Sequence, residues 1–84
     1  MNKGGVVVQA EPKWHRKGGR DVADFDGKTV IVRSSSAGFE VVLKEPGEAG
    51  FTYKVLGRRA SRESARRSGV RILLGQTVSD WNGA

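Results

Sequence analysis

Residues 28–56, KTVIVRSSSAGFEVVLKEPGEAGFTYKVL, contain three short stretches rich in β-branched and aromatic side chains. The stretches span residues 28–33, 39–44 and 51–56, and Gly, Pro and Ser residues separate them. This composition is typical of β-strands joined by turns. Parallel strands need a crossover of about a dozen residues, which these connections are too short to supply. The sequence therefore predicts an antiparallel β-meander.

Apolar residues alternate with polar ones along the second and third strands, as expected for strands with one buried side. The alternating apolar residues are Phe39, Val41 and Leu43 in the second strand, and Phe51, Tyr53 and Val55 in the third. We expect them to form an aromatic-rich face that another element of the chain must cover.

A short helix over residues 61–68 is expected to provide part of that cover. Ser61 is a favourable N-cap, and Glu63 and Arg67 have the four-residue spacing that stabilises an exposed helix. Gly69 is the residue type that commonly ends a helix in a left-handed conformation. Because alanine is its only apolar residue type, the helix is expected to lie across the sheet with its arginines turned to solvent.

The two ends of the chain are less clearly patterned. Residues 1–27 form a loosely patterned basic segment, with a short edge strand expected at residues 6–10 and a loop or arm at residues 13–17. A further strand is expected at residues 70–74. The predicted fold is α+β. It is an antiparallel meander of three to five strands with one short helix packed on it, and its core lies within residues 28–84.

The 84 residues are expected to form a single small domain, and the formal net charge is +6. Residues 1–20 hold five Lys and Arg against one acid, and residues 58–84 hold six Arg against two acids. If the fold brings these segments together, a positive patch results and polyanions become plausible partners. The chain has no cysteine, no run of about 20 apolar residues and no signal-peptide pattern, so a cytoplasmic protein without membrane attachment is expected.

Catalytic and cofactor-binding motifs are poorly matched. Residues 27–29, GKT, resemble the end of a phosphate-binding loop, but Val22 stands where that loop needs glycine and a strand follows instead of a helix. The aspartates of residues 21–26 lack the downstream ligands of a calcium loop. His15 is the only histidine and lies in an expected arm, which offers no held geometry for acid–base chemistry. We therefore expect a non-catalytic protein with no cofactor, metal or small-molecule substrate.

Arginines in and beside the predicted helix support a nucleic-acid hypothesis. Arg58, Arg62 and Arg66 are spaced to form one stripe along a helix, and arginine can pair phosphate oxygens through two hydrogen bonds. In the basic N-terminal segment, Trp14 offers a ring that can stack on an unpaired base. The candidate nucleic-acid-binding residues are Lys13, Trp14, Arg16, Lys17, Arg20, Arg58, Arg59, Arg62, Arg66, Arg67 and Arg71.

Large aromatic side chains support a rival hypothesis of protein binding. The candidate protein-interface residues are Trp14, Phe39, Phe51, Tyr53 and Trp81. Those that stay exposed can anchor a partner, because Trp, Tyr and Arg dominate interface hot spots. A homodimer that pairs edge strands or buries this face would also compensate for a small core. The alternative is that Trp14 and Trp81 fold back as part of the core.

The leading prediction is a protein-interaction module that modulates a partner or self-associates, and the alternative is a nucleic-acid-binding module. Both are stoichiometric binding functions without catalysis. In its size and its missing catalytic set, the chain resembles the small accessory proteins common in bacteriophage genomes, which often bind a host protein or nucleic acid. This is a resemblance of type, and it carries over no residue and no activity.

Overall fold

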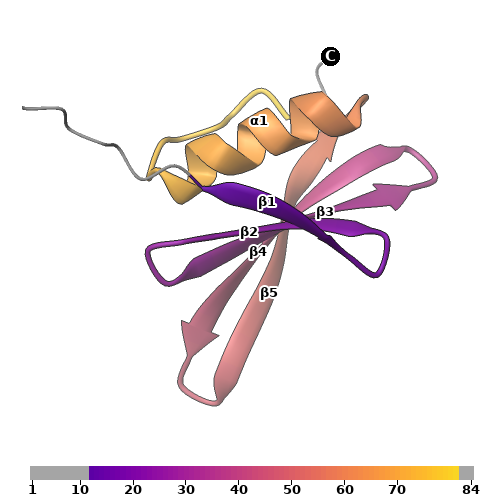
Figure 1. Ribbon diagram of the computed structural model, residues 1–84. Coiled ribbons are helices and arrows are strands. Elements are labelled where there is room, and N and C mark those ends of the chain that lie inside the picture. The colour runs from indigo at the N-terminus through magenta and orange to yellow at the C-terminus, as the bar shows by residue number, and fades with distance from the viewer. Residues whose placement is uncertain (1–11, 82–84) are drawn as a thin grey trace, which may run out of the picture.

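The computed structural model describes residues 12–81, which form one antiparallel sheet and one helix (Figure 1). The strands lie in the order β1-β2-β3-β4-β5, so each strand pairs with its neighbours in the sequence. The elements are β1 (Lys13–Lys17), β2 (Arg20–Phe25), β3 (Lys28–Ser35), β4 (Gly38–Gly47), β5 (Gly50–Arg59) and α1 (Arg62–Leu73). The predicted α+β fold, an antiparallel meander with one short helix, is confirmed.

The segment before β3 carries more structure than the sequence predicted. The loop expected at residues 13–17 is wrong, because these residues form β1 and pair with β2 in a hairpin. Trp14 is the only large apolar side chain of β1, so the strand shows no alternating pattern. The aspartates of β2 resemble turn residues, although Asp21 is buried within the strand. The edge strand expected at residues 6–10 lies outside the described residues.

Helix α1 begins where the sequence predicted. The Ser61 hydroxyl oxygen accepts a hydrogen bond of 3.1 Å from the backbone N–H of Ser64, which confirms the N-cap. The predicted end is wrong, because the helix continues past Gly69 to Leu73, into residues 70–74 where a strand was expected. No helix within residues 12–81 has the length and apolar character needed to cross a membrane.

The C-terminal end of α1 is set by Gly75 and not by Gly69. Gly75 has a φ of +84°, and its N–H donates to the Ile72 carbonyl at 3.0 Å. The N–H of Gln76 donates to the Arg71 carbonyl at 2.8 Å, which completes a Schellman motif. Val70, Ile72 and Leu73 therefore belong to the last turn of α1 and not to a strand.

Gly69 allows α1 to lie close to the sheet. A Cβ atom added to Gly69 would stand 2.7 Å from Cγ1 of Val30 and 3.1 Å from the Trp14 ring. The side chains between helix and sheet are small, and the largest that are fully buried are valines. The buried core cluster consists of Ala23, Val30, Val32, Val41, Ala65 and Leu73. Trp14, Phe25, Phe39, Leu43, Leu56, Ile72 and Trp81 pack around it, partly buried.

The turn between β4 and β5 determines which side of the sheet each apolar residue faces. Its register pairs Lys44 with Tyr53 and Pro46 with Phe51. Paired residues point to the same side of a sheet, so Tyr53 and Phe51 lie opposite the side that Leu43 shares with the core. The expectation that one aromatic-rich face unites both strands under the helix is therefore wrong.

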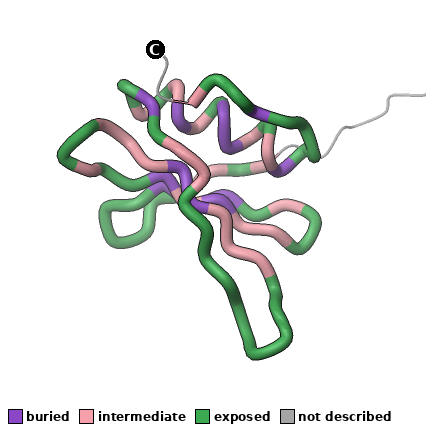
Figure 2. The backbone as a smooth tube through the Cα atoms, turned by 180° about the vertical axis from the view of Figure 1, so that it is seen from behind, coloured by how far each residue is buried: buried purple, intermediate pink, exposed green. Residues whose placement is uncertain are grey.

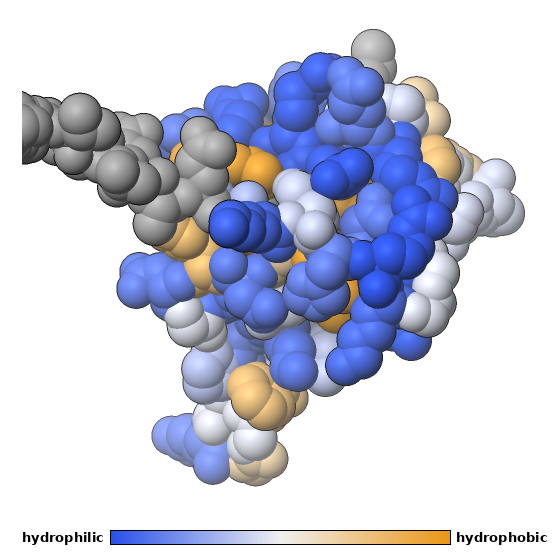
Figure 3. All heavy atoms as spheres, in the orientation of Figure 1, coloured by the Kyte–Doolittle hydropathy of each residue, from blue (hydrophilic) through white to orange (hydrophobic). Residues whose placement is uncertain are grey.

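The sheet thus has two distinct faces. We call the face that packs against α1 the covered face and the other the open face. The open-face side chains Phe51, Tyr53 and Val55 are 61%, 63% and 51% exposed. Figure 2 shows the β4–β5 hairpin projecting away from the helix, with β5 exposed over most of its length. In Figure 3, hydrophobic residues reach the surface on this lower hairpin, beneath a largely hydrophilic helix region.

Candidate functional site

Three of the candidate arginines converge on one buried carboxylate. Asp21, on the covered face of β2, is only 4% exposed. Its Oδ1 lies 3.0 Å from Arg16 Nε and 3.2 Å from an Arg62 terminal nitrogen, and its Oδ2 lies 4.0 Å from Arg66 Nε. These contacts tie β1, β2 and α1 together. Part of the positive charge predicted for the helix surface is consequently balanced inside the fold.

Arg59 holds the C-terminal segment onto the covered face. Its side chain is 5% exposed and donates to Ser68 Oγ at 2.9 Å, to the Asp80 carbonyl at 2.7 Å and to Asp80 Oδ1 at 2.9 Å. The Trp81 ring stacks 4.9 Å from this guanidinium and lies against Gly57. The hydrogen bond from Arg59 lowers the pKa of Asp80 below its ordinary value. Arg59 is therefore not available to a phosphate.

The last helical arginines also have partners within the chain. Arg67 donates to Glu63 Oε1 at 3.0 Å, which confirms the predicted pair. Arg71 donates to Gln76 Oε1 at 3.3 Å and to the Thr77 carbonyl at 3.5 Å. These groups are exposed and keep further N–H donors free for solvent, so they contribute positive potential without forming an open cluster.

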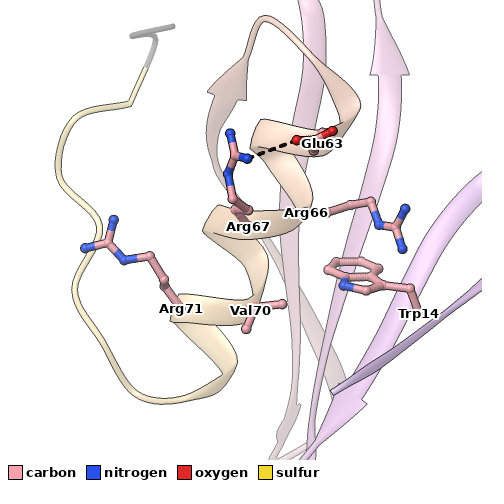
Figure 4. Close-up of a pocket in the computed structure, with 6 residues that line it drawn as sticks. All are labelled: Trp14, Glu63, Arg66, Arg67, Val70 and Arg71. Atoms are coloured by element: carbon pink, nitrogen blue, oxygen red, sulfur yellow. Dashed lines mark hydrogen bonds and ion pairs between the residues drawn. The ribbon is translucent and has the colours of Figure 1, made fainter. Parts of the chain in front are cut away.

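A groove of about 420 Å³ runs along the helix, and we call it the helix-side groove (Figure 4). Trp14 forms one wall from β1, and the Arg66 guanidinium lies over its ring at 5.2 Å. The lining residues are Trp14, Glu63, Arg66, Arg67, Val70 and Arg71. This groove contains a carboxylate, Glu63, and its aromatic ring is already stacked by an arginine.

A second groove, of about 440 Å³, lies on the open face, and we call it the open-face groove. Val22 and Ile31 are cross-strand neighbours at its base, and Lys17, Arg20 and Lys44 surround them. The lining residues are Lys17, Gly18, Arg20, Val22, Thr29, Ile31, Lys44 and Tyr53. No carboxylate is among them. The nearby Asp24 accepts a hydrogen bond of 2.5 Å from Thr29 Oγ1.

Exposed aromatic rings continue the open-face groove along the β4–β5 hairpin. Tyr53 forms part of its wall, and Phe51 lies two residues further along the same side of β5. The Lys44 ammonium group sits 4.3 Å from the Phe51 ring centroid and 5.8 Å from that of Tyr53. An apolar base, an aromatic wall and three cationic side chains thus lie together on one side of the sheet.

The structure separates the candidates predicted from sequence. Among the aromatic ones, Trp14, Phe39 and Trp81 pack against the core, whereas Phe51 and Tyr53 are exposed. Among the basic ones, Lys17 and Arg20 line the open-face groove, and Lys13 lies on the same face. Arg58 stands opposite Glu40 in the register of β4 and β5.

Sequence reasoning missed Lys44 and the apolar base of the open-face groove. The signal lay in the register of the β4–β5 hairpin, which places Lys44 beside Tyr53. A tight hairpin turn fixes register, so counting back from the turn would have found this pair.

Comparisons with models of protein families, with curated proteins and with solved structures find no match to this chain. Within residues 12–81, His, Asp and Glu side chains form no cluster of three or more that could hold a metal ion.

Proposed function

We propose that this protein is a non-catalytic binding protein that holds single-stranded nucleic acid across the open face of its sheet. The observation that carries the proposal is the open-face groove, where Lys17, Arg20 and Lys44 surround an apolar base beside Tyr53, with no lining carboxylate. Cations suit the phosphates, and an exposed ring suits an unpaired base. A cytoplasmic location belongs to this proposal, because nucleic acid is accessible there.

The open face supports this function better than the helix does. Within residues 12–81, Lys17, Arg20 and Lys44 form no ion pair. The charges of Lys17 and Arg20 are available to a ligand without breaking an ion pair, and Lys44 lies against the rings of Phe51 and Tyr53. By contrast, Arg62 and Arg66 share Asp21, so a phosphate would have to compete with a buried carboxylate.

A single strand fits better than a duplex. The bases of a duplex are stacked on one another, and their flat faces cannot reach the rings of Tyr53 and Phe51. Stacking on one aromatic side chain contributes about 1–3 kcal/mol per base. The grooved sheet with aromatic rings therefore favours unpaired bases, with the lysines and the arginine holding the backbone between them.

The salt dependence of binding distinguishes the two surfaces. Each phosphate contact on a single strand contributes about −0.7 to the slope of log affinity against log salt. Three engaged cations predict a slope of about −2, whereas engagement of the arginines between residues 58 and 71 other than the buried Arg59 predicts about −3.5. Fluorescence anisotropy with a labelled single-stranded oligonucleotide at several salt concentrations measures the slope.

Charge reversal tests the site itself. The Lys17→Glu/Arg20→Glu double variant is expected to weaken binding by about 10-fold or more, because both side chains line the groove. The Arg67→Glu/Arg71→Glu double variant changes the net charge by the same amount on the helix surface, so it is the matched control and is expected to change affinity much less. Equal losses in the two variants, or affinity independent of salt, would contradict the proposal.

A second candidate function is binding of a protein surface. The observation that favours it is the exposure of Phe51, Tyr53 and Val55 on one side of β5, since clustered apolar residues rimmed by polar ones mark interaction sites. Such binding would persist at high salt. Its strength would depend on Tyr53 and be insensitive to reversal of Lys17 and Arg20.

A further inference from the structure

The two edges of the sheet differ in how they are protected. β1, Lys13–Lys17, has the sequence KWHRK, and its charged side chains are the usual defence of an edge strand against pairing. Among residues 12–81, β5, Gly50–Arg59, forms the other edge of the sheet and pairs with β4 alone. Lys54 is the only charged residue between Glu48 and Arg58. Long, weakly charged, apolar edges are where another strand adds to a sheet.

We propose that two copies of this protein pair through their β5 edges, antiparallel about a two-fold axis, and form one continuous sheet. The inference deepens the second candidate function, because it names the protein partner as a second copy of the chain. It is independent of the nucleic-acid proposal. The open face stays uncovered in such a dimer, and the two open faces lie side by side.

The sequence of β5 is self-complementary in one register. With Tyr53 at the two-fold axis, Phe51 of each copy stands opposite Val55 of the other, and Thr52 stands opposite Lys54. Aromatic and β-branched residues are favourable cross-strand partners. All side chains keep their face, since paired residues point to the same side of the sheet.

The neighbouring register centred on Lys54 is less favourable. A shift of one residue in each copy centres the axis on Lys54 and places the two ammonium groups directly opposite one another, which is destabilising. The register centred on Tyr53 avoids this repulsion. It also places the most exposed large apolar residue of the described chain, 63% exposed, at the centre of the contact.

The distribution of charge also favours self-association through the β5 edge over the β1 edge. Each copy carries a net charge of +6, so two copies repel one another. The contact must form where charge is sparse, and β5 meets this condition better than the basic β1 does. Because salt screens the repulsion, dimerisation is expected to strengthen with salt, whereas nucleic-acid binding weakens.

Sedimentation equilibrium of the full chain over a range of concentrations tests the proposal. The expected mass rises from the monomer value of 9.1 kDa towards twice that value, and the rise occurs at lower concentration in high salt. Tyr53→Lys is expected to keep the monomer mass at every concentration, because two ammonium groups then meet at the axis. His15→Lys on β1 is the matched control and should still dimerise. A wild-type chain that remains a monomer throughout would overturn the proposal.

Cysteine cross-linking tests the register. The chain contains no cysteine, so a single introduced thiol can be cross-linked only to its copy. Oxidation of Tyr53→Cys is expected to give a covalent dimer, because position 53 faces itself across the axis. Thr52→Cys faces position 54 of the second copy and should cross-link far more slowly. Equal cross-linking at both positions, or faster cross-linking of His15→Cys, would contradict the register.

The two proposals can fail separately. A monomeric protein whose oligonucleotide affinity still depends on Lys17 and Arg20 would remove the dimer and leave the nucleic-acid function. A protein that dimerises through Tyr53 and does not bind oligonucleotides would remove the nucleic-acid function and leave self-association through the β5 edge.

Discussion

The covered and open faces of the sheet are built from the same strands, yet their side chains meet different demands. On β3, Val30 and Val32 point to the helix and are 0% and 1% exposed, whereas Ile31 between them helps to line the open-face groove. The covered face carries the buried apolar contacts that stabilise the domain. The open face keeps its rings and cations accessible. Because successive side chains of a strand point to opposite faces, the residues that stabilise the domain and the residues proposed to bind a ligand lie on different sides of the sheet.

The charges of the two faces differ in the same way. The buried ionised groups of the covered face have partners: Asp21 has three arginines, and Arg59 has Asp80. On the open face, Arg33 pairs with Glu40 at 2.9 Å, whereas the groove residues Lys17 and Arg20 form no ion pair with any of residues 12–81. Buried charges need internal partners because removal from water is costly, and solvated ones do not.

The largest expected effect is that of a cavity under the helix. Leu73 is 2% exposed, so Leu73→Ala is expected to lower the free energy of unfolding by about 2–5 kcal/mol. Tyr53→Ala removes a larger side chain from the open face but is expected to change stability by only about 0.5 kcal/mol. Urea denaturation followed by circular dichroism measures both. Equal losses would show that the two faces do not differ as described.

Removal of the shared carboxylate should have the next largest effect. Asp21→Ala leaves three arginines facing one another without a common partner, so we expect a loss of about 1–3 kcal/mol in unfolding free energy. Its open-face neighbour on β2 provides a control, since Asp24→Ala removes only an exposed hydrogen bond to Thr29. Similar denaturation midpoints for both variants would argue against a stabilising role for the Asp21 cluster.

The close approach of α1 can be tested at Gly69. Alanine favours a helix by about 1 kcal/mol over glycine, but its Cβ would meet Val30 at 2.7 Å. We expect the clash to dominate, and Gly69→Ala to lower the unfolding free energy by about 1 kcal/mol. If Gly69→Ala instead raises the thermal midpoint, helix and sheet are further apart than described.

The smallest effect concerns the C-terminal segment in acid. The folded-state pKa of Asp80 is lowered by the hydrogen bond from Arg59, so the native state binds its proton less readily than the unfolded chain. The resulting stabilisation is complete above the unfolded value near 3.8 and is lost as the pH falls through the lower folded value. Trp81 fluorescence should therefore change in this range. Asp80→Asn should abolish the titration, and a titration that persists in this variant must have another origin.

The strands over residues 28–56 and the start of the helix were predictable because local signals determine them. β-branched runs between turn residues identified the meander, and Ser61 identified the N-cap. β1 was not predictable from its own residues, since an edge strand of charged side chains is stabilised by pairing with β2. The helix end was misread because Val70 and Ile72 favour strands, although tertiary packing overrides that propensity.

The candidate site was only partly predictable, because it depends on register. Alternation alone shows that Phe51 and Tyr53 share a side, but only the hairpin pairing shows that this side is opposite the helix. A β-bulge between Val41 and Val42 then shifts the alternation, so Arg59 returns to the covered face and is buried. Such irregularities leave no simple trace in the sequence. Phe39 was listed as an interface candidate although it packs against the core, whereas Trp14 and Trp81 pack there as the alternative interpretation expected.

The most direct test of the separation between the two faces is a map of amide chemical-shift changes in the ¹⁵N-labelled protein when a single-stranded oligonucleotide is added. The changes are expected to concentrate on the open face, around Val22, Ile31, Lys44 and Tyr53, and to leave α1 nearly unaffected. Changes concentrated on α1 between Arg62 and Arg71, with a silent open face, would contradict the account.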